Sequence, residues 1–479
     1  MRKYSFFFLA GLLGLGSCQK GFLDLAPISE TNSINFYRNA DDMLNAVNAA
    51  YAALQFNGQY NQAMYAFGEV RSDNTEILDA QSGIDITQVD AFTTISNNGL
   101  VNSAWNDHYR GILACNTVID RIEGVEMNAD LKRRIAGEAQ FLRALMYFNL
   151  VRIFGDVPLV IKETTNVEDG YAYTRDPAEA VYTQIIKDLS EAEAKLPVSY
   201  TGNNIGRATS GAAKGLLAKV FLTQRKWAEA AAKAKEVMDL NQYQLLPNYA
   251  SLFNLTNENS KESLFEVQYK KGGLGLGSPF NNRFAPRLSG VIVTTIGAGT
   301  GHNHPTADIA TAYEDGDNRK AASFAPGFRA ANNQFVDVRY VTKYIDPAPF
   351  AASDADNNWP VLRYADVLLM RAEALNEVGY VADGEAFTLL NQIRTRAGLA
   401  PKTSAELSTQ GAFRRAVEEE RRIELAFENH RWFDLVRTGR ALEVMNSKGF
   451  SIDATQLLLP IPQNQIDINP DKIKQNPGY

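Results

Sequence analysis

The sequence predicts a mainly α-helical protein built from paired helices, interrupted by one long segment of turns and short strands. Apolar residues recur at helical spacing over residues 130–154, among them Ile135, Leu142 and Leu150. Residues 210–240 have the pattern of two helices joined by a short turn, with small residues that allow the helices to approach closely. These two stretches predict helix packing as the main architecture.

The helix pairs are expected to repeat along the chain. A similar first helix contains Arg143-Ala144 followed by Tyr147, and another contains Arg371-Ala372 followed by Leu375. The spacing resembles a tetratricopeptide repeat, a helix pair that must stack on neighbouring pairs to bury its apolar face. We therefore expect a helical scaffold over residues 30–240 and 360–445.

The residues from about 242 to 360 break this helical pattern. They contain "KKGGLGLGSPFNNRF" and "FAPGFRAANNQF", which are rich in Gly, Asn and Pro, and short β-like runs such as "SLFEVQY". Long loops in a compact protein often carry function. We expect this loop-rich, partly β insert to bind the ligand, and we expect an extended tail over residues 446–479.

The start of the chain has the features of a lipoprotein signal. Basic residues precede an apolar core at residues 6–15, which is shorter than the about 20 residues that a membrane span needs. The following "LGSC", ending at Cys18, resembles a bacterial lipobox, in which the cysteine is lipidated and becomes the new N-terminus. We expect a cleaved signal peptide at residues 1–17 and a single lipid-anchored domain at 18–479; an ordinary signal with an incidental cysteine is the alternative.

Composition indicates a globular, acidic protein. Of its 479 residues 45% are hydrophobic and 22% are charged, and the formal net charge is −7. An acidic surface argues against nucleic acid or anionic lipid as the main partner. Once Cys18 is acylated, Cys115 has no disulfide partner, and its helical context predicts a buried, unreactive thiol.

Motifs for catalysis and metal binding are mostly missing from the sequence. HExxH, a Walker loop, GxSxG and paired CxxC do not occur. His302 and His304 lie two residues apart, but solvated loop residues are the expectation there, with a metal pair as the alternative. A glycosidase carboxylate pair is defined by a distance in space, so the sequence does not test it.

The run at 418–440, "EEERRIELAFENHRWFDLVRTGR", is dense in charge. Acidic and basic residues recur there at three- and four-residue spacings, which typically support a helix. We predict a structural ion-pair network for this run, with an active site as the alternative. Its members are Glu420, Arg421, Glu424, Glu428, Arg431, Asp434 and Arg437.

Ten motifs in order carry a resemblance to a known family. The chain resembles the SusD/RagB family of outer-membrane lipoproteins over nearly its whole length. The matching stretches include "FLDLAP", "RSDN", "AWNDHYRGILACNTVID", "EAQFLRALMYFNLVRIFGDVPLV", "YEDGDNRKA", "LRYADVLLMRAEALNEVG", "ERRIELAFENHRWFDLVRTG" and the closing "QNPGY".

This resemblance implies a largely α-helical, SusD-like fold and a function in nutrient uptake. Proteins of this family are surface-exposed outer-membrane lipoproteins, with acyl chains such as palmitate on the cysteine. They cap a TonB-dependent (SusC-like) transporter and capture oligosaccharides without catalysis or a cofactor. The alternatives are capture of a peptide or other nutrient, a hydrolase, or a tetratricopeptide-type adaptor without a small ligand. A structural calcium ion is left open.

The candidate ligand residues follow from sugar chemistry. Pyranose C–H faces stack on aromatic rings, and sugar hydroxyls pair with planar polar groups. We therefore expect exposed rings beside such groups, with Trp105 and Tyr109 assigned to the core instead. The alternatives are an Arg71–Asp73 pair and an Arg363 paired with a buried carboxylate. The candidates are Asp73, Asn74, Tyr60, Tyr65 and Phe92 in the N-terminal part, and Phe280, Asn281, Asn282, Phe284, Tyr344, Trp359 and Arg363 in and beside the insert.

Overall fold

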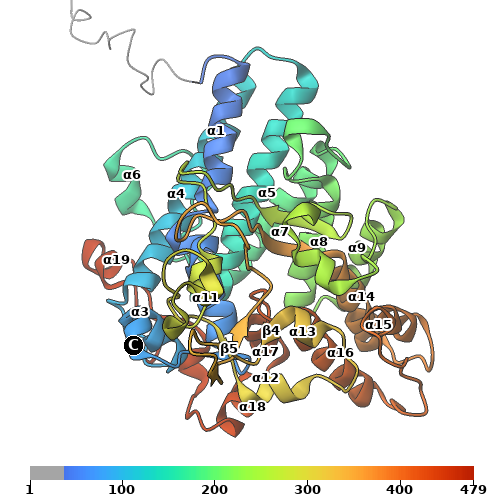
Figure 1. The fold of residues 1–479 in the computed structure, drawn as a ribbon. Coiled ribbons are helices and arrows are strands. Elements are labelled where there is room, and N and C mark those ends of the chain that lie inside the picture. The colour runs from blue at the N-terminus through green and yellow to red at the C-terminus, as the bar shows by residue number, and fades with distance from the viewer. Residues whose placement is uncertain (1–36) are drawn as a thin grey trace, which may run out of the picture.

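Long helices packed side by side form the body of the molecule (Figure 1). The structure is a computed structural model that describes residues 37–479, so the predicted signal peptide and Cys18 lie outside the described residues. Each helix of the scaffold packs on the next one in the chain of contacts. In order they are α1 (Ala40–Ala53), α4 (Gly99–Arg121), α5 (Ala129–Phe154), α7 (Ala178–Lys195), α8 (Ser210–Thr223), α9 (Trp227–Asp239) and α14 (Tyr364–Val378).

The predicted helix pairs are confirmed. The stretch at 130–154 is α5, and the stretch at 210–240 forms α8 and α9, separated by a short turn. The helix predicted around Arg371 is α14, which packs against α15 (Glu385–Arg396) and α16 (Gln410–Glu424). The mainly α fold with tetratricopeptide-like helix pairs therefore agrees with the prediction.

Shorter helices fill the rest of the described chain. Near the N-terminus, two π-helical turns (Asn57–Asn61 and Ala66–Val70) flank the short helix α2, and the short helix α3 precedes α4. The remaining short helices are α2 (Ala63–Tyr65), α3 (Ile84–Asp90), α6 (Val167–Ala172), α10 (Phe280–Arg283), α11 (Val291–Thr294), α12 (Ala307–Ala312), α13 (Arg319–Ser323), α17 (Arg431–Thr438), α18 (Ala441–Ser447) and α19 (Gln463–Ile468).

The insert leaves and rejoins the scaffold through one antiparallel strand pair. Strand β2 (Ser263–Val267) pairs with β8 (Trp359–Arg363), and both pack on α8. A Cβ at Gly215 of α8 would lie 2.7 Å from side-chain atoms of Leu264 and Leu362, so a larger residue here would force these leucines to shift. The strand pair therefore fixes the base of the insert against the scaffold.

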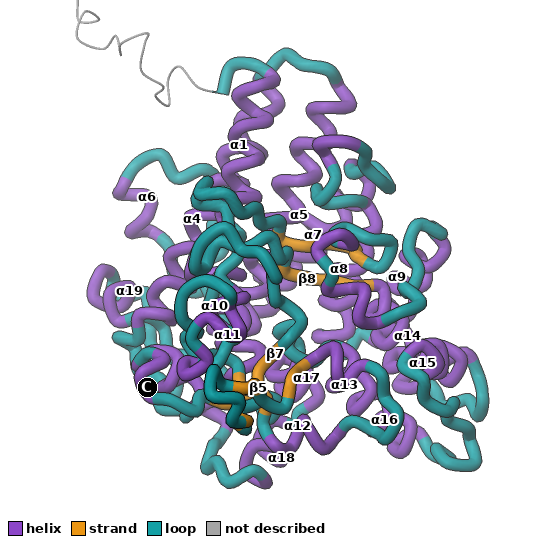
Figure 2. Tube along the Cα trace, in the orientation of Figure 1, coloured by secondary structure: helices purple, strands orange, loops and turns teal. Residues whose placement is uncertain are grey.

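Beyond this base, the insert consists mainly of loops, with few strand residues (Figure 2). Three more antiparallel pairs link β1 with β3, β4 with β7 and β5 with β6. The expectation of a loop-rich, partly β insert is thus confirmed. The strands are β1 (Thr75–Glu76), β3 (His304–Pro305), β4 (Phe324–Ala325), β5 (Phe328–Arg329), β6 (Phe335–Val336) and β7 (Tyr340–Val341).

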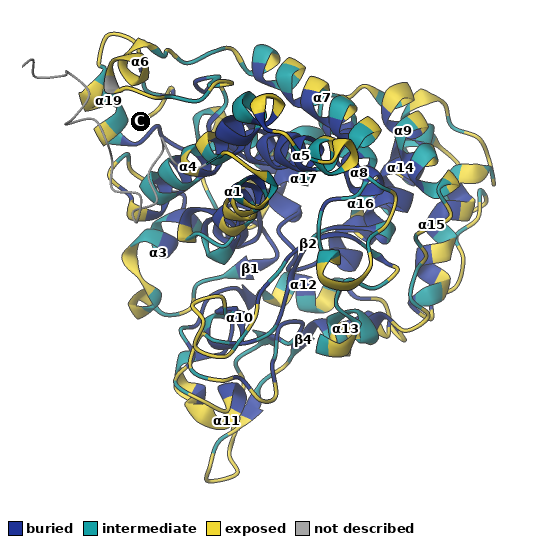
Figure 3. Ribbon diagram, turned by 90° about the horizontal axis from the view of Figure 1, so that it is seen from above, coloured by how far each residue is buried: buried dark blue, intermediate teal, exposed yellow. Residues whose placement is uncertain are grey.

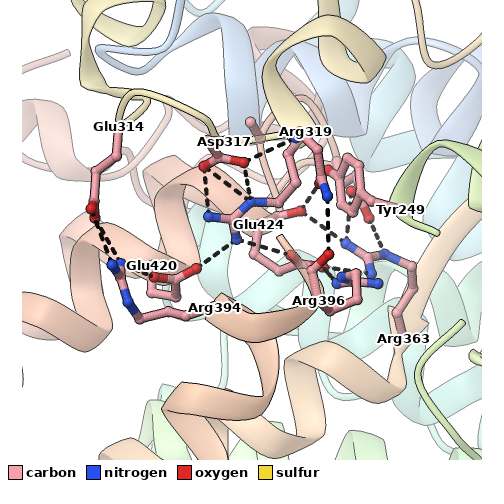
Figure 4. A network of polar contacts seen from close by, with 12 residues as sticks. Tyr249, Glu314, Asp317, Arg319, Arg363, Arg394, Arg396, Glu420 and Glu424 are labelled. Atoms are coloured by element: carbon pink, nitrogen blue, oxygen red, sulfur yellow. Dashed lines mark hydrogen bonds and ion pairs between the residues drawn. The ribbon is translucent and has the colours of Figure 1, made fainter. Parts of the chain in front are cut away.

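A buried ion-pair network joins the insert to α15 and α16 (Figure 4). The carboxylate of Glu424, at the end of α16, accepts hydrogen bonds from Arg319 of the insert at 3.1 Å, Arg363 of β8 at 3.1 Å and Arg396 of α15 at 2.5 Å. Arg363 also contacts Glu262 and Glu428, both at 2.7 Å. One carboxylate therefore connects three segments that are far apart in the sequence.

The guanidinium groups decide the ionisation of Glu424. Burial by itself raises the pKa of this carboxyl group, but Arg396, Arg363 and Arg319 outweigh burial and hold its pKa at about 2. Charge-assisted hydrogen bonds of this kind are about twice as strong as neutral ones. Glu424 is therefore ionised at every pH at which the protein is expected to fold.

The predicted structural network at 418–440 is confirmed, but most of its partners were not predicted. We expected pairs three or four residues apart, and Arg437 with Asp434 is one of these. Arg431 instead pairs with Asp73 at 2.7 Å, and Arg421 pairs with Asp366 at 2.7 Å. The charges are buried, so they need partners from whatever elements pack against them.

The tail returns to the first helices of the scaffold. The backbone N–H of Leu459 donates to Ile153 O at 2.9 Å, and the side-chain amide of Asn476 donates to Phe154 O at 3.0 Å. Cys115 of α4 is buried, as predicted, and burial raises its thiol pKa to about 12. In the part of the chain from 37 to 479, no helix combines the length and the apolar character that crossing a membrane requires.

Replacing Arg363 with methionine is expected to cost about 3–5 kcal/mol of unfolding free energy, because it removes one cationic partner from each of the buried carboxylates of Glu262, Glu424 and Glu428. Urea unfolding followed by circular dichroism measures this loss. The matched control is Arg414→Met, which removes a half-exposed pair with Glu377 and should cost about 0–1 kcal/mol. Equal losses in the two variants would contradict a special role for the buried network.

Candidate functional site

The insert meets the N-terminal part of the chain at one exposed surface. We call the surface formed by residues 77–84 and 285–301 the insert face. Arg287 Nε lies 2.7 Å from the Asp79 carboxylate, and its Nη2 donates to the side-chain oxygen of Gln81 at 2.8 Å. These planar polar groups lie at the junction of the two loops and remain partly open to solvent.

His302 fixes the junction from beneath. Its Nε2 lies 3.0 Å from the carbonyl oxygen of Ser82, and its Nδ1 lies 2.7 Å from the hydroxyl of Tyr65. A carbonyl only accepts, so Nε2 carries the proton and Nδ1 accepts from the tyrosine. Burial lowers the pKa of His302 to about 4, so the neutral ring that makes both bonds persists at neutral pH. The solvated loop expected for His302 and His304 is wrong, since both are buried.

A buried aromatic cluster supports the insert face. The rings of Tyr344 and Trp359 are stacked 4.8 Å apart at 7°, and Phe280 lies 4.7 Å from Trp359. Tyr65 contacts Phe284 edge-on at 5.0 Å. The structure therefore brings together five aromatic candidates that are separated by up to nearly 300 residues in the sequence.

Two asparagine candidates hold the outer loop in place. The Asn281 amide donates to Thr294 O at 3.0 Å, and the Asn282 amide donates to Ile296 O at 2.8 Å. The side-chain oxygen of Asn282 also accepts from the backbone N–H of Ser353 at 3.0 Å. Both side chains are buried and bind the protein's own backbone, so they shape the loop that carries α11.

The polar candidates of the N-terminal part are held by arginines. Asp73 binds Arg431 through both carboxylate oxygens, at 2.7 and 2.9 Å, and does not pair with Arg71. Burial opposes ionisation of Asp73, but Arg431 outweighs it and lowers the pKa. The side-chain oxygen of Asn74 accepts from Arg422 at 2.8 Å. Arg363 pairs with buried carboxylates, which was the alternative expected for it.

The two remaining candidates lie in the core of the scaffold. The Tyr60 hydroxyl accepts a hydrogen bond from Asn149 at 3.1 Å. Phe92 packs 5.3 Å from Trp432, and the Arg71 guanidinium lies 4.2 Å from its ring centre. Neither residue belongs to the aromatic cluster beneath the insert face. Trp105 is buried, as predicted, and Tyr109 is partly buried against the core.

The expectation of exposed aromatic platforms is wrong. Each of the seven aromatic candidates is at most 6% exposed; they are Tyr60, Tyr65, Phe92, Phe280, Phe284, Tyr344 and Trp359. An insert with so little regular secondary structure needs its own apolar interior, and aromatic rings bury the most area per residue. Direct contact between these residues and a ligand stays a prediction. Because the rings are buried, their effect on a ligand would be indirect, through the residues that cover them.

The insert face itself shows aliphatic side chains. Leu288 is 82% exposed, and Leu78, Val291, Ile292 and Ile296 are also exposed. In Figure 3, α11 lies at the outer edge of the molecule with exposed residues along it. Sequence reasoning missed Asp79, Gln81 and Arg287 because each stands in an ordinary turn; only the contact between the two loops marks them.

A separate cleft of about 750 Å³ runs between α4 and the tail, where Trp105 and Thr164 line it. None of the candidate ligand residues of the sequence analysis lines this cleft, and we assign it no ligand.

Comparison with known proteins identifies the family. A family model described as the SusD family matches residues 225–479, and one described as starch-binding and associating with the outer membrane matches residues 21–222. The first match covers more than half of the chain, so the chain belongs to the SusD family, as its motifs predicted.

Relatives and solved structures agree over nearly full length. SusD-like protein P2 of Formosa agariphila is 28% identical over 512 residues, covering 100% of both chains. The starch-binding protein SusD of Bacteroides thetaiotaomicron is 24% identical over 76% of each chain. A solved laminarin binding SusD-like protein superimposes with a TM-score of 0.81 at 29% identity, covering 92% of this chain and 100% of that one.

Acid should weaken the fold partly through His302. Its folded pKa of about 4 lies below the ordinary 6.5, so the unfolded chain takes up a proton first as the pH falls. Between pH 6.5 and 5 this group should cost about 2 kcal/mol of unfolding free energy. Urea titrations at both pH values should show a smaller loss for His302→Gln, because the glutamine amide does not titrate in this range. Equal losses in the wild type and the variant would contradict the assignment.

Proposed function

From its membership of the SusD family, we propose that the protein captures oligosaccharides at the outer membrane and passes them to a SusC-like, TonB-dependent transporter. In this function the protein neither cleaves the sugar nor uses a cofactor. The solved relative described as laminarin binding, at 29% identity over almost the whole chain, is the observation that carries it. The family model described as associating with the outer membrane supports the location.

The insert face is the proposed ligand surface. Its Arg287, Asp79 and Gln81 side chains supply donors and acceptors in fixed planes, which suit the hydroxyl groups of a sugar. The aliphatic side chains of Leu78 and Leu288 flank them and offer apolar contact to the C–H faces of a ring. The predicted residues beneath, from Tyr65 to Trp359, act by holding these loops in place.

Capture of a peptide or another nutrient is the second candidate. The aliphatic character of the insert face favours it, because an aromatic platform is the feature that sugar binding most often uses. The transporter role would be the same. The two candidates differ only in the chemistry of the cargo.

Native gels containing laminarin should retard the mature protein without release of reducing sugar. Arg287→Ala should weaken the binding about tenfold, because it removes charge-assisted hydrogen bonds to the ligand. Arg415→Ala, an exposed arginine on α16, is the matched control and should leave the retardation unchanged. Starch and other neutral polysaccharides complete the panel.

Two results would contradict this proposal. Release of reducing sugar from any polysaccharide in the panel would contradict a binding protein without catalysis. A protein that no polysaccharide retards, but that binds peptides, would instead establish the second candidate.

The lipid anchor is tested at Cys18, which lies outside the described residues. Each buried acyl CH₂ contributes about 0.8 kcal/mol of membrane affinity, so loss of acylation in Cys18→Ala should release the protein from the membrane fraction. Cys115→Ala is the matched control and should stay membrane-bound, because Cys115 is buried in α4. If Cys18→Ala stays in the membrane fraction, a protein partner rather than lipid provides the anchor.

A further inference from the structure

A hollow on the helical repeat lies apart from the insert face. Its volume is about 570 Å³, within the about 300–1,000 Å³ range of small-molecule sites. It is formed by the segment after α9, the start of α14 and the outer face of α15. In Figures 1 and 3, α15 lies at one side of the molecule and α11 of the insert at another. The side chains that matter are Tyr243, Gln244, Tyr364, Asn391, Gln392 and Thr395.

The hollow is lined entirely by neutral residues. Its eight lining residues are tyrosine, glutamine, asparagine, threonine and leucine. Burial raises the pKa values of Tyr243 and Tyr364, so both hydroxyls stay protonated at neutral pH. An anionic ligand would need arginine or lysine here, and a metal ion would need carboxylates or histidines. The lining therefore fits a neutral ligand rich in hydroxyl groups.

The two tyrosines form a fixed aromatic floor. Their ring centres lie 6.4 Å apart and their planes differ by only 24°. The Tyr243 hydroxyl hydrogen-bonds with Thr209 at 2.8 Å, and a Cβ at Gly211 would lie 2.3 Å from this hydroxyl oxygen. Tyr243 is therefore seated against α8, and both rings are only partly buried. Two nearly parallel rings held in this way, each partly open to solvent, suit stacking on the C–H face of a sugar.

Several polar groups around the floor are open to a ligand. Among residues 37–479, the side chains of Gln244, Gln392 and Thr395 and the Tyr364 hydroxyl have no hydrogen-bond partner. The side chain of Asn391, by contrast, is already bonded to the backbone of Lys402. Its amide donates to Lys402 O at 2.8 Å, and its oxygen accepts from the Lys402 N–H at 2.7 Å. A ligand that covered these open groups without bonding to them would incur a desolvation cost for each group. A sugar hydroxyl both donates and accepts, so it can bond to them and avoid this cost.

We propose that the hollow between Tyr243, Tyr364 and α15 is a second saccharide-binding site. It takes a neutral hexose unit, stacked on the tyrosines and hydrogen-bonded by Gln392, Thr395 and Gln244. It is open and shallow, so it binds one or two units of a longer chain weakly. Its binding does not depend on the insert face.

The test uses the mature full-length protein and three neutral glucose hexasaccharides, with β-1,3, β-1,4 and α-1,4 linkages. Dissociation constants are measured by NMR titration in the wild type and in Arg287→Ala, which weakens the insert face. Gln392→Ala/Thr395→Ala is added to each background. Both residues are exposed on α15, and alanine favours helix, so the fold is kept. Thr183→Ala, on the exposed surface of α7, is the control.

The Arg287→Ala protein should retain some saccharide binding through the hollow. Adding Gln392→Ala/Thr395→Ala to it should weaken this remaining binding about fivefold or more, because neutral hydrogen bonds to the sugar are lost. Tyr364→Phe, which removes only a hydroxyl, should also weaken it. Unchanged dissociation constants in both backgrounds would overturn the proposal. The proposal would also be overturned if Gln392→Ala/Thr395→Ala no longer copurified with a protein that the wild type binds, while its sugar binding stayed unchanged. The hollow would then be a protein-docking site.

The two proposals fail in different ways. If Arg287→Ala binds like the wild type while Gln392→Ala/Thr395→Ala loses binding, the insert face is not the ligand surface and the hollow stands. If only Arg287→Ala loses binding, the hollow falls and the insert face stands. A wild type that binds none of the three hexasaccharides overturns the second site as well as sugar capture.

Discussion

The buried carboxylate of Glu424 holds the insert on the helical scaffold. It takes hydrogen bonds from arginines of the insert, of β8 and of α15, and these arginines reach further carboxylates in turn (Figure 4). Taking such charges out of water is costly, and their attraction repays the cost only when every partner is in place. The network therefore adds less to stability than an apolar core of equal size would, but displacing any of the three segments would leave buried charges with fewer partners.

This arrangement of the three segments positions the proposed ligand surface. The insert has few strands, so its shape depends on point contacts rather than on a sheet. The network fixes its base, the cluster around Trp359 fills its interior, and His302 ties its outer loop to the loop at 77–84. These contacts reach the insert face through backbone carbonyl groups such as Ser82 O and Ile296 O, and not through its exposed side chains. Its exposed residues are therefore free to differ without loss of the fold, which suits a scaffold that presents different ligand surfaces.

How much the sequence could predict depended on the range of the interaction. Helices α5, α8, α9 and α14 follow from local periodicity, and the charged run at 418–440 was correctly assigned to an ion-pair network. The partners of Arg431 and Arg421 lie far along the chain, and no spacing rule reaches them. Tyr344 and Trp359 have the residue type of a sugar platform, but exposure is set by packing, and packing placed them inside.

The hollow at Tyr243, Tyr364 and α15 could not be found from the sequence for the same reason. Tyr243 follows α9 and Tyr364 begins α14, so their rings become neighbours only because α14 packs on α9. A rigid helical repeat keeps such a surface in shape without any ligand, so little ordering cost accompanies binding. Two weak sites on one rigid body gain affinity only for a chain long enough to span both, since the second contact then becomes intramolecular. A protein of this design selects polymers over their short fragments, because a fragment contacts one site at a time.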